Sequence, residues 1–175
     1  MKFREFYEER PYFLNEREYW GSIGAGVIPF AHDTQKFLLS LRSKEVNEPG
    51  TWGVIGGKLD EGETNPKVAA LREFKEEIGL PIDDSSLELV YVYNSKEKNE
   101  NGKSAFTYYT FIANMDNELP ELETKQYGWE TDTCKWFSLE ELELAQNLHY
   151  GVKELLKRKA IQKVITNEEP SYINT

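Results

Sequence analysis

The chain has 175 residues and a formal net charge of −10, with 39% hydrophobic and 13% aromatic residues. This length suits one domain with a buried core. The acidic balance argues against a broad nucleic-acid-binding surface, because phosphate backbones are held by clusters of lysine and arginine. No run reaches the roughly 18 apolar residues of a membrane span, and the charged N-terminus lacks the apolar core of a secretion signal. The single cysteine, Cys134, cannot form an internal disulfide, which fits a reducing compartment. We therefore expect a cytoplasmic protein without a membrane partner.

The first part of the chain predicts an extension followed by short strands. Residues 1–20 mix aromatic and charged side chains without a clear period, so we expect an N-terminal extension packed on the domain or on a partner subunit. The domain itself is expected over residues 21–165. Within it, apolar runs predict strands at residues 22–30, 36–42 and 51–55.

A glycine-rich acidic loop then leads into an amphipathic helix, and together they span residues 57–80. Asn65 is a good N-cap, Pro66 is favoured at the first helical position, and Gly79 is a typical C-terminal stop. The face that packs on the sheet is expected to consist of the apolar residues at helical spacing, which are Val68, Leu71, Phe74 and Ile78. The acidic residues are expected to point elsewhere.

Three of these acids form a cluster on the predicted helix. Glu73, Glu76 and Glu77 have the spacing i, i+3 and i+4, so they project from one face. Like charges at this spacing repel each other and cost helix stability. A bound cation would offset the repulsion, and oxygen-only ligands suit a hard divalent ion such as Mg²⁺ or Mn²⁺.

The rest of the chain predicts a hairpin, an acidic loop, a last strand and two helices. In chain order these are the strands 86–93 and 104–113, the loop 116–132, the strand 133–137, a helix capped by Ser138 with Glu141 in a capping box, and a helix from 151 to about 165. Residues 166–175 are expected to be a flexible tail. This order predicts an α+β fold with a mixed sheet between helices, an α/β/α sandwich.

Residues 57–80 resemble the Nudix box, in which glycine, five residues and glutamate precede seven residues and the run Arg-Glu-apolar-x-Glu-Glu-x-Gly-apolar. Here Gly57, five residues and Glu63 precede the run Arg72-Glu73-Phe74-Lys75-Glu76-Glu77-Ile78-Gly79-Leu80. Eight residues rather than seven separate Glu63 from Arg72. The extra residue is expected in the turn before the helix, where it leaves the later register intact and puts the direction of Glu63 in question. The resemblance spans roughly residues 22–156.

This resemblance implies an enzyme that hydrolyses the pyrophosphate linkage of a nucleoside diphosphate derivative with Mg²⁺ or Mn²⁺. It implies metal ligands at Glu73, Glu76 and Glu77, together with the carbonyl of Gly57, and an Arg72 that orients Glu73 through a charge-assisted hydrogen bond. The metal would neutralise the diphosphate and activate the attacking water. The catalytic base stays open among Glu73, Glu63 and the later loop residue Glu130.

Four further residues are candidates for contacts with the substrate. Arg42 and Lys58 are candidates for contacting phosphates, and Tyr127 and Trp129 are candidates for stacking on a nucleobase. Trp52 is expected in the core, His32 and His149 share no ligand spacing with other residues, and Cys134 is expected to pack rather than react. The substrate stays open among nucleoside triphosphates, dinucleotide polyphosphates, ADP-ribose and nucleotide sugars.

Two other interpretations compete with the enzyme. One is a catalytically silent Nudix module that binds a nucleotide as a sensor or scaffold, for which the longer turn before the helix is the only support. The other is a protein-interaction domain that uses the aromatic N-terminal arm. Many Nudix enzymes are dimers, so the resemblance also allows a homodimer.

Overall fold

The computed structural model describes residues 23–99, 101–119, 122 and 127–166, and the structural statements below refer to this part of the chain. The predictions for the extension 1–20 and for the tail beyond Thr166 lie outside the described residues. Within them, no helix has the length and apolarity that a membrane crossing requires.

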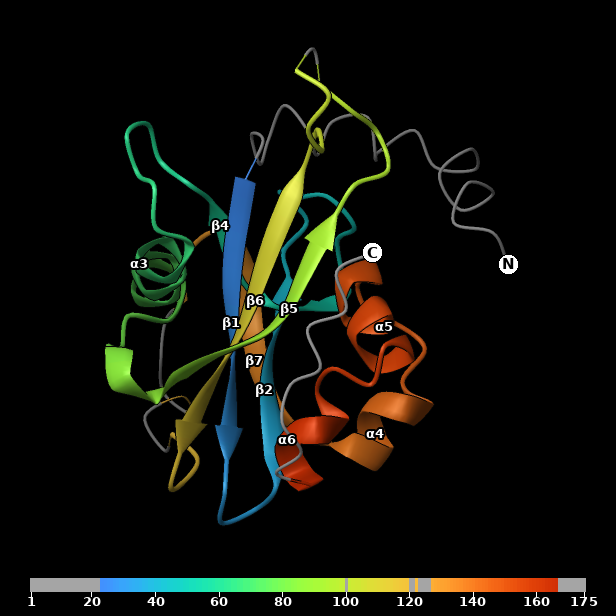
Figure 1. Ribbon diagram of the computed structural model, residues 1–175. Coiled ribbons are helices and arrows are strands. Elements are labelled where there is room, and N and C mark those ends of the chain that lie inside the picture. Colours follow the sequence, from blue (N-terminus) through green and yellow to red (C-terminus); the bar gives the residue numbers. More distant parts are fainter. Residues whose placement is uncertain (1–22, 100, 120–121, 123–126, 167–175) are drawn as a thin grey trace.

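A mixed seven-stranded sheet forms the centre of the molecule (Figure 1). Its main path is β3-β2-β1-β6-β5, with β4 paired to β1 and β7 paired to β2. β1 and β6 are parallel, and β5 and β6 form the predicted antiparallel hairpin. The strands are β1 (Ile23–Ala31), β2 (Lys36–Arg42), β3 (Trp52–Gly53), β4 (Ile55–Lys58), β5 (Leu87–Asn94), β6 (Thr107–Met115) and β7 (Thr131–Ser138). The segment predicted as one strand at 51–55 is therefore two strands separated by Val54.

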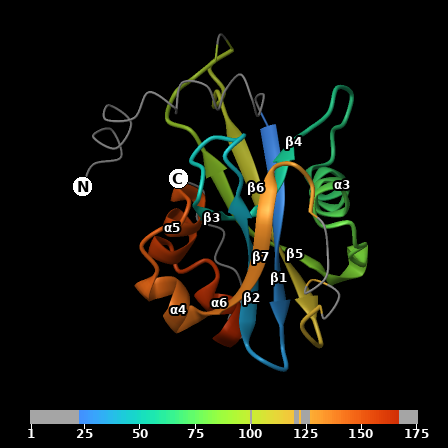
Figure 2. The same cartoon turned by 180° about the vertical axis from the view of Figure 1, so that it is seen from behind.

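Helices cover both faces of this sheet (Figures 1 and 2). α3 (Pro66–Ile78) lies on one face, and α4 (Leu139–Leu144), α5 (Tyr150–Lys157) and α6 (Gln162–Thr166) lie on the other. A short 3₁₀ helix, η1 (Asp84–Ser86), precedes β5. Each face carries its own hydrophobic cluster, one containing Phe74 of α3 and the other Leu155 of α5. The predicted α/β/α sandwich is confirmed.

The ends of α3 follow the local sequence signals. The Asn65 side chain accepts a hydrogen bond from the Lys67 backbone N–H at 3.0 Å, and Pro66 begins the helix. Gly79 ends it in the left-handed conformation, with φ of 74°, and donates its N–H to the Lys75 carbonyl at 2.9 Å. Because glycine has no Cβ, this conformation carries no steric penalty there. The predicted start and end of the helix are confirmed.

The predicted packing face of α3 is wrong in two respects. Val68 is 50% exposed, whereas Ala69 and Ala70 are fully buried against the sheet. Small residues fill this part of the contact because the helix lies close to β1 and β4. Glu77 is also buried, so the acidic residues do not all point away from the packed face.

The helix expected from residue 151 to about 165 is broken into two pieces. α5 ends at Lys157, and Lys159 has a positive φ of 55° that no α-helix continues. The Ala160 N–H then donates to the Leu155 carbonyl at 2.9 Å and closes the turn before α6. The capping box of Ser138 and Glu141 at the start of α4 is present as predicted.

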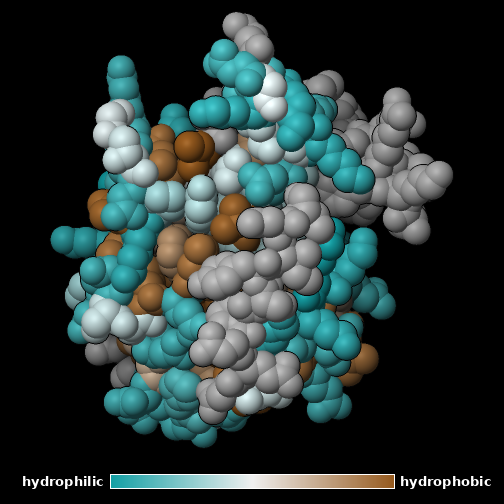
Figure 3. All heavy atoms as spheres, viewed as in Figure 1, coloured by the Kyte–Doolittle hydropathy of each residue, from teal (hydrophilic) through white to brown (hydrophobic). Residues whose placement is uncertain are grey.

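The face seen in Figure 1 is mainly hydrophilic at its margins, and hydrophobic residues reach the surface near its centre, over the strands (Figure 3). This distribution agrees with the large share of charged residues in the chain, 30%. Hydrophilic residues therefore form the solvent-exposed margins of this face, and its centre is less polar.

Candidate active site

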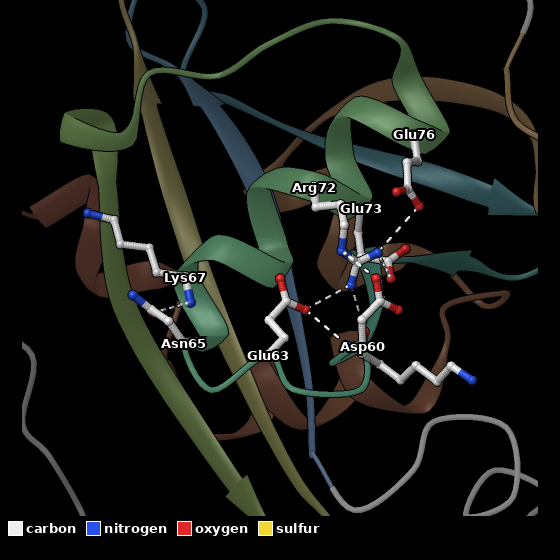
Figure 4. Close-up of polar contacts among 8 residues, drawn as sticks. Asp60, Glu63, Asn65, Lys67, Arg72, Glu73 and Glu76 are labelled. Atoms are coloured by element: carbon white, nitrogen blue, oxygen red, sulfur yellow. Dashed lines mark hydrogen bonds and ion pairs between the residues drawn. The ribbon is translucent and has the colours of Figure 1, made fainter.

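Arg72, in the middle of α3, gathers the polar residues of the preceding loop (Figure 4). Its guanidinium donates from Nη1 to Glu73 Oε1 at 2.9 Å and from Nη2 to Glu63 Oε2 at 3.1 Å. Nη2 also donates to the Lys58 carbonyl at 3.0 Å, and Nε lies 3.2 Å from a carboxylate oxygen of Asp60. The contact between Arg72 and Glu73 that the sequence led us to expect is therefore present. Although partial burial opposes the charge, the hydrogen bonds to Glu63 and Glu73 raise the pKa of Arg72, so it stays protonated.

The extra residue between Glu63 and Arg72 lies outside the helix. α3 begins only at Pro66, so the turn at residues 64–65 absorbs the additional length. Glu63 points toward Arg72 and also accepts a hydrogen bond from the Asp60 backbone N–H at 3.1 Å. Burial opposes ionisation, but the hydrogen bonds from Arg72 and the Asp60 backbone, together with the charge of Arg72, lower the pKa of Glu63. The longer turn thus leaves Glu63 as an ionised partner of Arg72.

Glu73 lies against the backbone of β4 at Gly57. A Cβ atom placed on Gly57 would meet the Glu73 carboxylate, with 2.5 Å to Cδ and 2.7 Å to Oε2. Only glycine permits this approach. Burial raises the pKa of Glu73, although the hydrogen bond and charge of Arg72 act in the opposite direction. Its side chain is 13% exposed, so this carboxylate is largely desolvated before any ligand arrives.

Glu77 connects the helix to two other elements. Its Oε1 accepts the Gly56 backbone N–H at 3.0 Å, and its Oε2 accepts the Thr131 hydroxyl at 2.7 Å. Burial raises the pKa of Glu77 to about 8, and the nearby charge of Glu130 adds to this effect. Glu77 therefore joins α3, β4 and β7 around one buried carboxyl group.

Glu76 and Glu130 complete the acidic group. The Glu76 side chain is 60% exposed and lies 3.4 Å from Arg72 Nη1. Glu130 immediately precedes Thr131, whose hydroxyl binds Glu77, and the charge of Glu130 raises the pKa of both Glu73 and Glu77. The structure thus brings together all the acids that the sequence proposed for the site.

These residues fit a divalent metal ion in their donor chemistry. Among the described residues, no three acidic, histidine or cysteine side chains are arranged as a ready-made metal site. The carboxylates of Glu73 and Glu63 accept hydrogen bonds from Arg72, and the carboxylate of Glu77 accepts them from Gly56 and Thr131. The donors are nevertheless all oxygen atoms, as Mg²⁺ and Mn²⁺ prefer. The close approach of Gly57 to Glu73 also puts the backbone of β4 beside this carboxylate.

The predicted substrate contacts are distributed over different places. The Lys58 side chain is exposed at the end of β4. Tyr127 packs with the hydrophobic cluster on the α3 side and donates its hydroxyl to the Leu122 carbonyl at 2.9 Å, and Trp129 is 63% exposed. Arg42 is buried and donates from Nε to the Asn47 carbonyl at 2.6 Å. Of these four side chains, only Arg42 lines the pocket on the other face of the sheet.

That pocket, called the aromatic pocket below, lies between the sheet and α5. Its empty space is about 600 Å³ when the solvent at its mouth is included. Its wall combines aromatic rings with a few polar groups, namely Tyr91, Tyr93, Phe106, Tyr108, His149 and Tyr150 with Arg42, Thr110 and Glu154. Trp52 lies outside this wall and packs on Phe137 with ring centroids 5.0 Å apart, in agreement with its predicted place in the core.

Sequence reasoning missed the aromatic pocket, although a signal for it was present. Tyr91 and Tyr93 on β5, like Tyr108 and Thr110 on β6, have the two-residue spacing that puts side chains on one face of a strand. In the sheet, Tyr91 pairs with Thr110 and Tyr93 with Tyr108. His149, which was set aside as incidental, lines this pocket and accepts the Gly151 N–H on Nδ1 at 3.2 Å.

The aromatic pocket and the acidic group share one wall. A Cβ atom placed on Gly56 would lie 2.8 Å from the hydroxyl oxygen of Tyr108, so this hydroxyl rests directly on β4. Gly56 is also the residue whose N–H binds Glu77. The aromatic pocket and the acidic group therefore contact the same strand, β4, from opposite faces of the sheet.

A comparison with known families agrees with this arrangement. The profile of the NUDIX domain matches residues 22–159. The chain belongs to the Nudix family. The match covers the sheet, all of α3 and α5, and both sides of the site.

Two of the relatives that the chain resembles have names that state a substrate. A putative 8-oxo-dGTP diphosphatase 3 of Mycobacterium tuberculosis is 32% identical over 118 residues, which are 63% of this chain and 53% of the relative. The dihydroneopterin triphosphate diphosphatase of Escherichia coli is 31% identical over 77 residues, 44% of this chain and 49% of the relative. The chain thus spans about half the length of these curated relatives.

Solved structures show the same fold. A Nudix hydrolase from M. smegmatis, RenU, superimposes with a TM-score of 0.64 at 25% identity and covers 88% of this chain and 90% of its own. The NUDIX domain of Shewanella oneidensis NrtR, solved with ADP-ribose, gives 0.62 at 17% identity and covers 93% and 99%. The second likeness concerns the fold alone.

Proposed function

We propose that this protein hydrolyses the pyrophosphate linkage of a nucleoside triphosphate or related nucleoside diphosphate derivative in a metal-dependent reaction. The observation that carries the proposal is the shared wall at Gly56, which contacts the aromatic pocket through Tyr108 and the acidic group through Glu77. The group proposed to bind the base and the group proposed to bind the phosphates would thus both contact one strand, β4. The named activities of the two curated relatives, both on triphosphates, support this class of substrate.

Different residues of the site would hold the metal ion and the phosphates. Glu73, Glu76 and Glu77, with the Gly57 carbonyl, are the groups that would hold Mg²⁺ or Mn²⁺, which supplies charge neutralisation of the diphosphate and activation of water. Arg72 fixes the rotamer of Glu73 through its hydrogen bond. On the pocket side, buried Arg42 offers a positive charge to phosphate oxygens.

In the metal-free protein Glu73 is the stronger base of the two, and both Glu73 and Glu63 stay candidates for removing the proton from water. Arg72 lowers the pKa of Glu63, whereas burial raises the pKa of Glu73. A carboxylate with a raised pKa holds a proton better and is the stronger base. Glu130, whose charge acts on Glu73 and Glu77, is the alternative base.

A substrate panel tests the proposal. The protein is incubated with nucleoside triphosphates, dinucleotide polyphosphates, ADP-ribose and a nucleotide sugar, with Mg²⁺, with Mn²⁺ and with a chelator, and products are separated by ion-exchange chromatography. We expect cleavage of at least one triphosphate that stops when the metal is chelated. Tight nucleotide binding by calorimetry without cleavage in any condition would instead identify a silent binding module.

A further inference from the structure

One acidic side chain lies in the wall of the aromatic pocket. Glu154 belongs to α5, is 8% exposed, and is the only acid among the described residues that line this pocket. Arg158 donates from Nε to Glu154 Oε1 at 2.7 Å. The two oxygens of an ionised carboxylate offer about four acceptor positions in total, so Glu154 can accept further hydrogen bonds from donors that a ligand brings.

Glu154 also lies beside a ring that a bound base would contact. Tyr91 and Glu154 both line the aromatic pocket; burial raises the pKa of the Tyr91 hydroxyl, and the charge of Glu154 raises it further. Tyr91 lies on β5 and Glu154 on α5, so the sheet and the helix meet here. A planar base stacked on the tyrosines would therefore present its edge to α5.

We propose that Glu154 selects substrates whose base presents two adjacent N–H donors, the 2-amino-4-oxopyrimidine edge found in guanine, oxidised guanine and pterins. This inference rests on the proposed function and names the substrate class of the same site. An ionised carboxylate only accepts hydrogen bonds. Its two oxygens match the ring N–H and the amino group of this edge, and both bonds are charge-assisted.

The other bases lack this match. Adenine and cytosine present one amino group next to a ring nitrogen that accepts, so a lone pair would face the carboxylate. Uracil and thymine present one N–H between two carbonyl oxygens, and these oxygens would face the carboxylate of Glu154. A site built around a hydrogen bond rejects analogues that leave its buried polar group unpaired. Discrimination by Glu154 is thus expected to act mainly against these bases.

The test compares hydrolysis of dGTP, dATP, dCTP and dTTP by the wild type and by Glu154→Gln. We expect the wild type to prefer dGTP by roughly 10²-fold or more in kcat/KM. In Glu154→Gln, kcat/KM for dGTP should fall about 10- to 100-fold, because charge-assisted hydrogen bonds are lost. The value for dATP should stay or rise, because glutamine offers a donor to the adenine ring nitrogen and an acceptor to its amino group.

Arg158→Ala is the matched control. It removes the ion pair with Glu154 but keeps the carboxylate, so the preference for dGTP should stay within about threefold of the wild type, as for a partly exposed pair. An equal loss on all four substrates in Glu154→Gln, together with a lower melting temperature, would show a structural role and overturn the inference. So would a wild type that hydrolyses the four at equal rates, although the proposed function would then stand.

Product binding separates this inference from the proposed hydrolysis. Calorimetry with dGMP and dAMP measures the aromatic pocket without any chemical step. We expect dGMP to bind at least tenfold more tightly than dAMP to the wild type, and this preference to disappear in Glu154→Gln. Such a result supports the inference even if no triphosphate is cleaved, and equal affinity for the two nucleotides contradicts it.

Discussion

The two sides of the sheet are built from the sequence in different ways. On the α3 side, the loop and helix of residues 57–77 supply Gly57, Glu63, Arg72 and the three helical acids within one short stretch. On the α5 side, the aromatic pocket takes its residues from β5, β6 and α5, which are far apart in the chain. The residues proposed for catalysis thus lie close together in the sequence. The residues proposed to bind the base are brought together only by the tertiary fold.

This difference gives the two sides separate kinetic signatures. Substitutions on the α3 side should lower kcat by the same factor for every base, because the diphosphate is common to all substrates. Substitutions in the aromatic pocket should act mainly on KM and depend on the base. The following predictions, from the largest expected effect to the smallest, test that separation.

Glu76→Gln should have the largest effect. The side chain is 60% exposed, so its replacement should leave the melting temperature unchanged, while kcat falls by about 10²- to 10⁴-fold on all substrates. Steady-state kinetics and thermal unfolding measure the two quantities. Glu61→Gln, at an exposed acid of the preceding loop, is the control and should retain activity. A loss of stability that parallels the loss of activity would mean that Glu76 is structural.

Arg72→Lys should lower kcat by roughly 10- to 100-fold. A single ammonium group cannot replace the guanidinium that binds Glu73 and Glu63 at the same time, and hydrogen bonds between charged groups contribute about 1.5–3 kcal/mol. The same substitution in another Arg–Glu pair, Arg158→Lys, is the control and should leave kcat within about twofold. An equal change of kcat in both variants would show that Arg72 has no particular role in the reaction.

Tyr91→Ala should raise KM about tenfold with little change in kcat, because stacking of a base on an aromatic ring is worth about 1–3 kcal/mol. Trp129→Ala provides the comparison, since the sequence favoured Trp129 for stacking and the structure places it outside the aromatic pocket. We expect its KM to change less than about twofold. The reverse order of effects would move the base to the loop beside α3.

The smallest effect concerns the stability of the metal-free protein. The folded-state pKa of Glu77 is about 8, above the ordinary value of 4.5, so the folded state holds this proton more tightly than the unfolded state. The corresponding stability is fully present below pH 4.5 and is lost as the pH rises toward 8. In thermal unfolding with a chelator, Glu77→Gln should therefore gain stability relative to the wild type as the pH increases over this window. A constant difference between the two proteins would contradict the raised pKa.

The sequence predicted the local features of this molecule well. The limits of α3 follow from Asn65, Pro66 and Gly79, whose effects depend only on neighbouring residues. The order of the strands along the chain and the hairpin of β5 and β6 also agree with the structure. These features were accessible because capping, periodicity and motif spacing act over a few residues.

The features that sequence reasoning missed depend on tertiary contacts. The burial of Glu77 and the exposure of Val68 are set by how α3 lies on β1 and β4, and the helical period alone does not specify this orientation. The aromatic pocket forms only because α5 covers the face of β5 and β6 that carries Tyr91 and Tyr108. The residues of the pocket share no sequence motif. The two-residue spacing within each strand could be read from the sequence, but the contact between the strands and α5 could not.

The contact between Tyr108 and the strands beneath it has a consequence for affinity. A Cβ atom placed on Gly24 would lie 2.7 Å from the Tyr108 ring, and one placed on Gly56 would lie 2.8 Å from its hydroxyl oxygen. The absence of a Cβ atom at these two glycines lets the Tyr108 side chain pack close to the backbone of β1 and β4. A larger residue at either position would push the ring into the aromatic pocket, so it should reduce the space for a ligand and weaken its binding there.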